Sequence, residues 1–128
     1  MFEQEFGCEI GPNVRKFLVS QHPANKVLFD DAHHLDQLSA LDVITNLMVI
    51  VPYVFLWIAG FTCVSRSKAN NNREANKDCC QKGTEKTGTS LAACFAYIKK
   101  VLPIIVILEN LDDLLEKSSD TSISDCEF

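Results

Sequence analysis

The sequence predicts an α/β fold in which a mostly parallel sheet carries helices on its faces. Four short apolar runs of strand character alternate along the chain with segments of helical periodicity, a pattern typical of such sheets. The length of 128 residues suits one ordinary domain. With 47% hydrophobic and 23% charged residues, the composition is that of a globular protein rather than a disordered chain.

The amino-terminal half is expected to hold two strands and two helices. The run FGCEI (residues 6–10) reads as the end of a buried strand, and residues 13–23 follow with apolar side chains at helical spacing, capped by Asn13. KVLFDDA (residues 26–32) predicts a second strand. Residues 34–49 carry a stripe of leucine and isoleucine at helical spacing, which predicts a second helix.

The carboxyl-terminal half begins with the most apolar run of the chain. YVFLWIAGF (residues 53–61) is expected to form a strand that is covered on both faces. Residues 62–88 are polar and predict a loop of more than twenty residues, a length that is usually functional or disordered. A helix is expected to follow, with Thr89 or Ser90 as its cap and Pro103 at its end.

The last predicted strand covers residues 104–110 (IIVILEN). Four polar side chains lie at or just after the carboxyl ends of the predicted strands. These side chains are Glu9, Asp31, Cys63 and Glu109. Ligands of parallel α/β sheets bind at the carboxyl ends of the strands, so we expect all four to face the same edge.

Cys63 has two interpretations. A single cysteine after a strand is more often a buried core thiol than a catalyst. Glu109, which on its own reads equally well as an exposed strand end, would bring a carboxylate to the same edge. A thiolate beside a carboxylic acid suits nucleophilic attack on an electron-poor ring whose nitrogen must be protonated.

A membrane-associated protein is the competing class. Residues 47–64 contain no charged side chain over eighteen positions, which is the lower limit for a spanning helix. Pro52 and the many β-branched and aromatic residues of this stretch favour a strand instead. An inactive remnant or a small protein anchored by residues 47–64 remains the alternative to an enzyme.

Two further motifs carry little specificity. GTEKTGTS (residues 83–90) has the glycine spacing of a phosphate-binding loop but lacks the lysine and the preceding strand, so it reads as a loop with a helix cap. Cys79 and Cys80 could bind zinc with His33 and His34, but their spacing fixes no ligand geometry. No metal site is therefore predicted.

The charge distribution and the cysteine content limit the kinds of partner and the cellular compartment that can be expected. The net charge is −5, yet residues 64–100 hold eight Lys and Arg against three acids. This basic segment could meet a phosphate backbone, although a solvated loop accounts for it equally well. Six cysteines without a C-x-x-C spacing, and an amino terminus unlike a signal peptide, indicate a reducing compartment with free thiols.

Taken in order, these segments resemble the motifs of the cytosine C5-specific DNA methyltransferase family up to Leu111. AGFTCVS (residues 59–65) is similar to the catalytic loop whose cysteine attacks cytosine, and VILENL (residues 106–111) is similar to the Glu-Asn-Val signature. Thr62 and Leu111 stand where the family has proline and valine. The resemblance implies a Rossmann-like, S-adenosylmethionine-dependent methyltransferase fold with an incomplete sheet.

The resemblance also implies roles for individual residues. Cys63 would add to C6 of a flipped-out cytosine, and Glu109 would hold the N3 side of the ring. S-Adenosyl-L-methionine would be bound by four residues of the matching motifs. These are Glu9, at the ribose; Ile10, beside the adenine; Asp31, at the adenine amino group; and Gly60.

Residues 1–116 are accordingly expected to form a partial catalytic domain, and residues 117–128 a disordered acidic tail. The family's first glycine-rich motif and the carboxyl-terminal half of its domain are not found in the sequence. DNA is the expected partner, with RNA open as an alternative, and the expected location is nuclear or otherwise intracellular. No membrane attachment and no particular oligomeric state are predicted.

Overall fold

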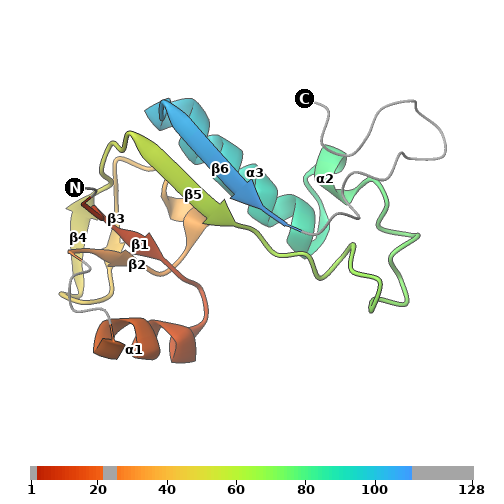
Figure 1. Cartoon of the computed structure of the whole chain (residues 1–128), viewed down its shortest axis with the longest axis horizontal. Helices are drawn as coiled ribbons and strands as arrows, with labels where there is room; N and C mark the ends of the chain where they lie inside the picture. The colour runs from red at the N-terminus through yellow and green to blue at the C-terminus, as the bar shows by residue number, and fades with distance from the viewer. Residues whose placement is uncertain (1–2, 22–25, 111–128) are drawn as a thin grey trace.

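The computed structural model describes residues 3–21 and 26–110, which form a mixed α/β arrangement (Figure 1). The expected Leu111 signature position and the expected tail of residues 117–128 lie outside the described residues. The elements follow in the order β1 (Gly7–Cys8), α1 (Pro12–Gln21), β2 (Leu28–Phe29), η1 (Ala32–His34), β3 (Ser39–Asp42), β4 (Leu47–Ile50), β5 (Leu56–Gly60), α2 (Cys79–Lys82), α3 (Glu85–Val101) and β6 (Ile105–Glu109).

The strands form two sheets rather than the single sheet that the sequence predicts. One sheet has the order β1-β2-β3-β4, with β1 and β2 parallel and the other two pairings antiparallel. The other contains β5 and β6 in parallel, in register from Leu56 opposite Ile105 to Gly60 opposite Glu109. The α/β class is therefore confirmed, whereas the described sheets are only half parallel.

The helix predicted for residues 34–49 is wrong, because these residues form the β3–β4 hairpin. Asp42, which is 1% exposed, sets its turn. The Asp42 carboxylate accepts hydrogen bonds from the backbone N–H of Leu28 (3.0 Å), of Ile44 (3.1 Å) and of Thr45 (3.2 Å). The leucine stripe fails as a core face, since Leu38 is 78% exposed. Strand pairing and a buried carboxylate thus prevail over helical periodicity.

Helix α3 covers one face of the β5–β6 pair. Tyr97 of α3 lies with its ring centroid 4.3 Å from that of Trp57, and its hydroxyl donates to the main-chain oxygen of Pro52 (2.9 Å). The prediction that β5 is covered on both faces is wrong, since Ile58 is 63% exposed. Within residues 3–21 and 26–110, no second layer packs on this outer face (Figure 1).

Helix α3 begins earlier than predicted, which shortens the expected loop. Thr84, rather than Thr89 or Ser90, is its N-cap, and the short helix α2 precedes it. Gly88 lies where the two helices touch, because a β-carbon there would stand 2.0 Å from the carbonyl oxygen of Cys79. The glycine-rich segment therefore serves helix packing.

One aromatic cluster joins the two sheets. The ring centroid of Phe6 lies 5.3 Å from that of Phe29 in the first sheet and 5.8 Å from those of Trp57 and Tyr97. Leu35, which is fully buried, belongs to the same hydrophobic core. The stretch 47–64 supplies β4 and β5, and within the described residues no helix combines the length and apolarity needed to cross a membrane.

Candidate active site

The predicted site residues lie at the ends of strands in two pairs. In the first sheet, the N–H of Glu9 donates to the oxygen of Phe29 (3.1 Å), which places the ends of β1 and β2 side by side. Glu9 and Asp31 both lie close enough to Cys8 to raise its pKa. Burial first, and then the charges of Asp31, Asp30 and Glu9, raise the pKa of Cys8 to about 12.

Glu9 helps to form the turn from β1 into α1. Its Oε1 atom accepts a hydrogen bond from the N–H of Gly11 (2.6 Å). Arg15 of α1 reaches back and donates from Nη1 to the carbonyl oxygens of Glu9 (3.0 Å) and Ile10 (2.8 Å). The turn is thereby fixed, and the side chain of Ile10 is left exposed beside Glu9.

Asp31 caps the 3₁₀ helix η1. Its Oδ1 atom accepts from the N–H of His33 (2.9 Å) and lies 2.7 Å from the Nδ1 atom of the His33 ring. Burial by itself raises the pKa of Asp31, but the His33 hydrogen bonds and charge outweigh burial and lower that pKa below its ordinary value. Asp31 is therefore ionised at neutral pH.

The second pair lies at the ends of β5 and β6. Gly60 and Glu109 are opposite each other in register, and the Oε2 atom of Glu109 lies 3.2 Å from the point that a β-carbon on Gly60 would occupy. Gly60 thus leaves room for the carboxylate to lie over the end of β5. Cys63, half-buried, follows three residues later.

Asn110, and Ser90, which was expected only as a helix cap, hold the start of the Cys63 segment. Asn110 donates from Nδ2 to the carbonyl oxygen of Phe61 (2.6 Å), and the N–H of Thr62 donates to the hydroxyl of Ser90 (3.2 Å). The carbonyl oxygen of Cys63 in turn accepts from the backbone of residues 66 and 67. No local sequence pattern predicts these two contacts, because the bonded residues are separated by 28 positions in one contact and by 49 in the other.

The two pairs are not directly joined. In the described part of the chain, no hydrogen bond or ion pair links Glu9 or Asp31 to Cys63 or Glu109. The structure brings Glu9 and Asp31 to neighbouring strand ends and places the Glu109 carboxylate over Gly60, and Cys63 follows Gly60 by three residues.

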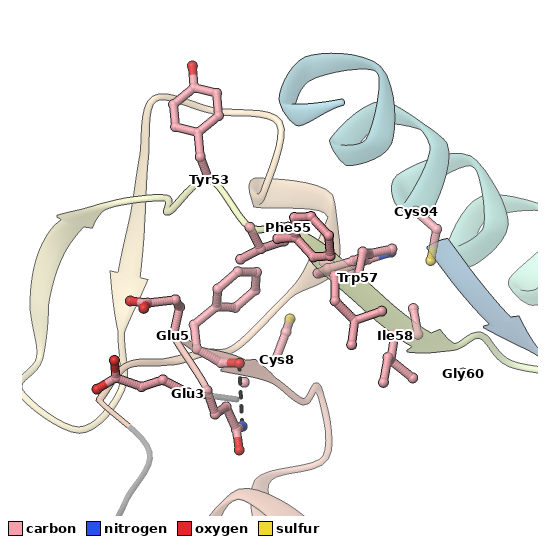
Figure 2. A pocket seen from close by; sticks show the side chains of 16 residues that line it. Glu3, Glu5, Cys8, Tyr53, Phe55, Trp57, Ile58, Gly60 and Cys94 are labelled. Carbon is pink, nitrogen blue, oxygen red and sulfur yellow. Dashed lines mark hydrogen bonds between the residues drawn. The ribbon is translucent and has the colours of Figure 1, made fainter. Parts of the chain in front are cut away.

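A cavity of about 850 Å³ lies between β1 and β5; Cys8, Trp57 and Cys94 line it, together with the polar side chains of Glu3 and Glu5 (Figure 2). Of the predicted site residues, Gly60 alone is among its lining residues. β1 is paired with β2, and β5 with β6, so each has its other edge toward the gap between the two sheets.

The described residues contain no group of three or more His, Cys, Asp or Glu side chains arranged to hold a metal ion. Cys79 and Cys80 are buried in a cluster with Leu91. His33 and His34 lie on η1, beside Asp31 and Asp30. The two cysteines thus lie on α2 and the two histidines on η1.

Comparison with known proteins shows a similarity to a DNA methyltransferase. No protein-family model matches the chain. The chain is 30% identical over 110 residues to the protein described as DNA (cytosine-5-)-methyltransferase DMT5 of Cryptococcus neoformans var. grubii serotype A. The match covers 86% of this chain but only 4% of the length of that relative. It suggests the cytosine C5-methyltransferase family, which the motifs around Cys63 and Glu109 resemble.

Proposed function

We propose that this chain carries the nucleophile-bearing part of an S-adenosylmethionine-dependent methyltransferase that acts on C5 of cytosine in DNA. The fungal relative supports the family. The observation that carries the assignment of residues is the pairing of Gly60 with Glu109, which brings the Glu109 carboxylate to the strand end that leads into Cys63.

Cys63 and Glu109 would act on the base from their strand ends. The Cys63 thiolate forms a bond to C6 while Glu109, as the acid, donates a proton or hydrogen bond to N3, so that electron density moves to C5. S-Adenosylmethionine, when bound, would supply the methyl group that C5 takes, and it would leave as the thioether S-adenosylhomocysteine. Water then takes the C5 proton, the Cys63 sulfur leaves as the thiolate, and N3 returns any proton it received to Glu109, which restores the aromatic ring.

The residues at the ends of β1 and β2 fit a nucleoside. Glu9 and Asp31 each use one carboxylate oxygen within the fold, and in the described part of the chain the other oxygen of each has no hydrogen-bond partner. Two such acceptors can bind ribose hydroxyls and an exocyclic amine. The exposed Ile10 offers an apolar contact for a purine, and Gly60 lines the cavity between β1 and β5.

Residues 1–116 would then be one part of a larger catalytic domain. The open edges of β1 and β5 toward the cavity support this proposal, because a further strand between them would join the two sheets. The uncovered outer face of β5, where Ile58 is exposed, would gain a covering layer in the same larger domain.

The basic segment of residues 64–100 would contribute to binding of the nucleic acid. Its exposed lysines include Lys68, Lys82, Lys86 and Lys99. Arg66 is buried and belongs to the fold rather than to such a surface. DNA is the favoured substrate because the relative's description names it, with RNA as the alternative, and a DNA substrate would place the protein in the nucleus or another DNA-containing compartment.

Transfer of a labelled methyl group tests this function. The natural protein, purified at the length at which its own cells make it, is incubated with DNA and S-adenosylmethionine labelled in its methyl group. Label is expected at C5 of cytosine; Cys63→Ser should abolish it, and Glu109→Gln should slow it about 100-fold. The surface variant Glu74→Gln is the control and should match the native protein. Transfer that survives Cys63→Ser would refute the assignment.

A further inference from the structure

Ser65 and Thr87 form a closed pair of hydrogen bonds between the Cys63 segment and helix α3. The N–H of Ser65 donates to the Thr87 hydroxyl (3.1 Å), and the N–H of Thr87 donates to the Ser65 hydroxyl (3.2 Å). Ser65 is 3% exposed and Thr87 is 0% exposed. Each residue therefore satisfies a buried N–H of the other, and removal of either hydroxyl leaves a buried donor without its partner.

This pair holds the segment just after Cys63, while the start of the same helix holds the residue just before it. Ser90, three positions beyond Thr87, accepts from the N–H of Thr62. The first turns of α3 thus fix both flanks of a two-residue stretch that consists of Cys63 and Val64. A long polar segment was expected here, and the structure shows that its first residues are tied to a helix.

An apolar contact at this place would bury similar surface but would not fix the backbone register. Hydrogen bonds from both N–H groups specify one alignment of the segment on the helix, since a shift by one residue would break both. Gly88 allows the first turn of α3 to lie against Cys79 of α2, so the turn that contains Thr87 is itself closely packed.

We propose that Thr87 is a positioning residue that acts through Ser65 to hold Cys63 in the segment that follows β5. The functional consequence rests on the proposed methyl transfer, whereas the hold on Cys63 is a property of the fold that can be measured without it.

The test compares the rate of Cys63 alkylation by iodoacetamide, measured by peptide mass spectrometry, among the native protein and four variants: Thr87→Val, Thr87→Ser, Ser65→Ala and Thr89→Val. Thr87→Val removes the hydroxyl at constant shape, and Thr87→Ser restores it. Thr89→Val is the matched control, because the exposed Thr89 hydroxyl bonds only to carbonyl oxygens of its own helix among the described residues. Alkylation of the buried Cys79, Cys80 and Cys94 in the same molecules reports global opening.

Thr87→Val is expected to speed Cys63 alkylation about five-fold, as the loss of one buried hydrogen bond of about 1 kcal/mol implies, with the three buried cysteines unchanged. Thr87→Ser and Thr89→Val should match the native protein, and Ser65→Ala should behave as Thr87→Val does. Equal rates for Thr87→Val and Thr89→Val, or a parallel rise at all four cysteines in both Thr87→Val and Ser65→Ala, would overturn the proposal.

The same variants separate this inference from the proposed function. If the native protein transfers methyl groups, Thr87→Val should lower the turnover number and leave the Michaelis constant for DNA unchanged, and Thr87→Ser should restore turnover. If no protein transfers methyl groups while Thr87→Val still releases Cys63, the proposed function fails and the hold on Cys63 stands.

Discussion

The side-chain amide of Asn110 donates to the carbonyl oxygen of Phe61 at 2.6 Å, one residue beyond the ends of β6 and β5. This contact extends the link between the two parallel strands past their ladder. Asn110 directly follows Glu109, and Phe61 lies two residues before Cys63, so the contact joins the two segments that carry the candidate catalytic groups.

Loss of the Asn110 amide should loosen this link. Asn110→Ala is expected to lower the free energy of unfolding by about 1 kcal/mol, and Asn110→Asp by more, because a carboxylate would face the Phe61 carbonyl oxygen. Urea unfolding measures both. Asn72→Ala, at an exposed position, is the control and should stay within about 0.5 kcal/mol of the native protein. If Asn72→Ala lowered the free energy of unfolding as much as Asn110→Ala does, the prediction would be contradicted.

Asp42 should contribute strongly to the stability of the β3–β4 hairpin. Asp42→Ala leaves buried donors without their acceptor and is expected to cost about 2 kcal/mol or more at pH 7. Asp36→Ala is the matched control on an exposed carboxylate. A loss no larger than that of the control would show that the carboxylate does not set the turn.

The contribution of Asp42 should also depend on pH. Burial by itself raises its pKa, but hydrogen bonds from Leu28, Thr45 and Ile44 outweigh burial and lower the pKa in the folded protein. Because the folded pKa lies below the unfolded value of about 3.9, the stabilisation is complete above that value and is lost as the pH falls through the folded pKa. The stability difference between the native protein and Asp42→Ala should therefore shrink in urea titrations below about pH 4. A difference that is constant between pH 7 and pH 3 would contradict this.

Gly88 should tolerate no side chain. A β-carbon at 2.0 Å from the Cys79 carbonyl oxygen would force α2 away from α3, so Gly88→Ala is expected to destabilise the protein by about 1–3 kcal/mol even though alanine favours helices. Thr89→Ala, one position along on the exposed side, should change the midpoint of thermal unfolding little. Equal midpoints for the two variants would show that the helices are not in such close contact.

Cys8 should react slowly with alkylating reagents in the native protein at moderate pH. With its pKa raised to about 12, its alkylation rate should keep rising between pH 8 and pH 11, whereas in urea it should level off above the unfolded value of about 8.5. Peptide mass spectrometry after timed iodoacetamide labelling measures both. A plateau near pH 9 in the native protein would contradict the burial of Cys8 among carboxylates.

Most strands, but not their full environment, were predictable from sequence. Apolar runs flanked by glycine, proline or acidic residues located β1, β2, β5 and β6 correctly. The hairpin of residues 39–50 was missed because its leucines repeat at helical spacing, while Asp42 forms its bonds to Leu28 fourteen positions away. The exposed face of β5 was not predicted either, because a run of apolar residues does not indicate whether one or both faces of a strand are covered by other elements.

The site was predictable only as a set of strand ends. Glu109 follows from its place after an apolar run, and its position over Gly60 follows from a register that no local pattern encodes. The Ser65–Thr87 pair was not predictable, because serine and threonine near a helix start read as caps. Contacts between residues 22 positions apart arise from the packing of α3 and cannot be read from either segment alone.

The mass of a covalent adduct tests the central claim most directly. DNA that contains 5-fluorocytosine is incubated with S-adenosylmethionine and the natural protein, digested, and analysed by peptide mass spectrometry; fluorine at C5 leaves no proton to remove, so the sulfur cannot be expelled. We expect the methylated base to remain attached to the peptide that contains Cys63, and Cys63→Ser to yield no adduct. An adduct on any other cysteine, or none on the native protein, would contradict Cys63 as the nucleophile.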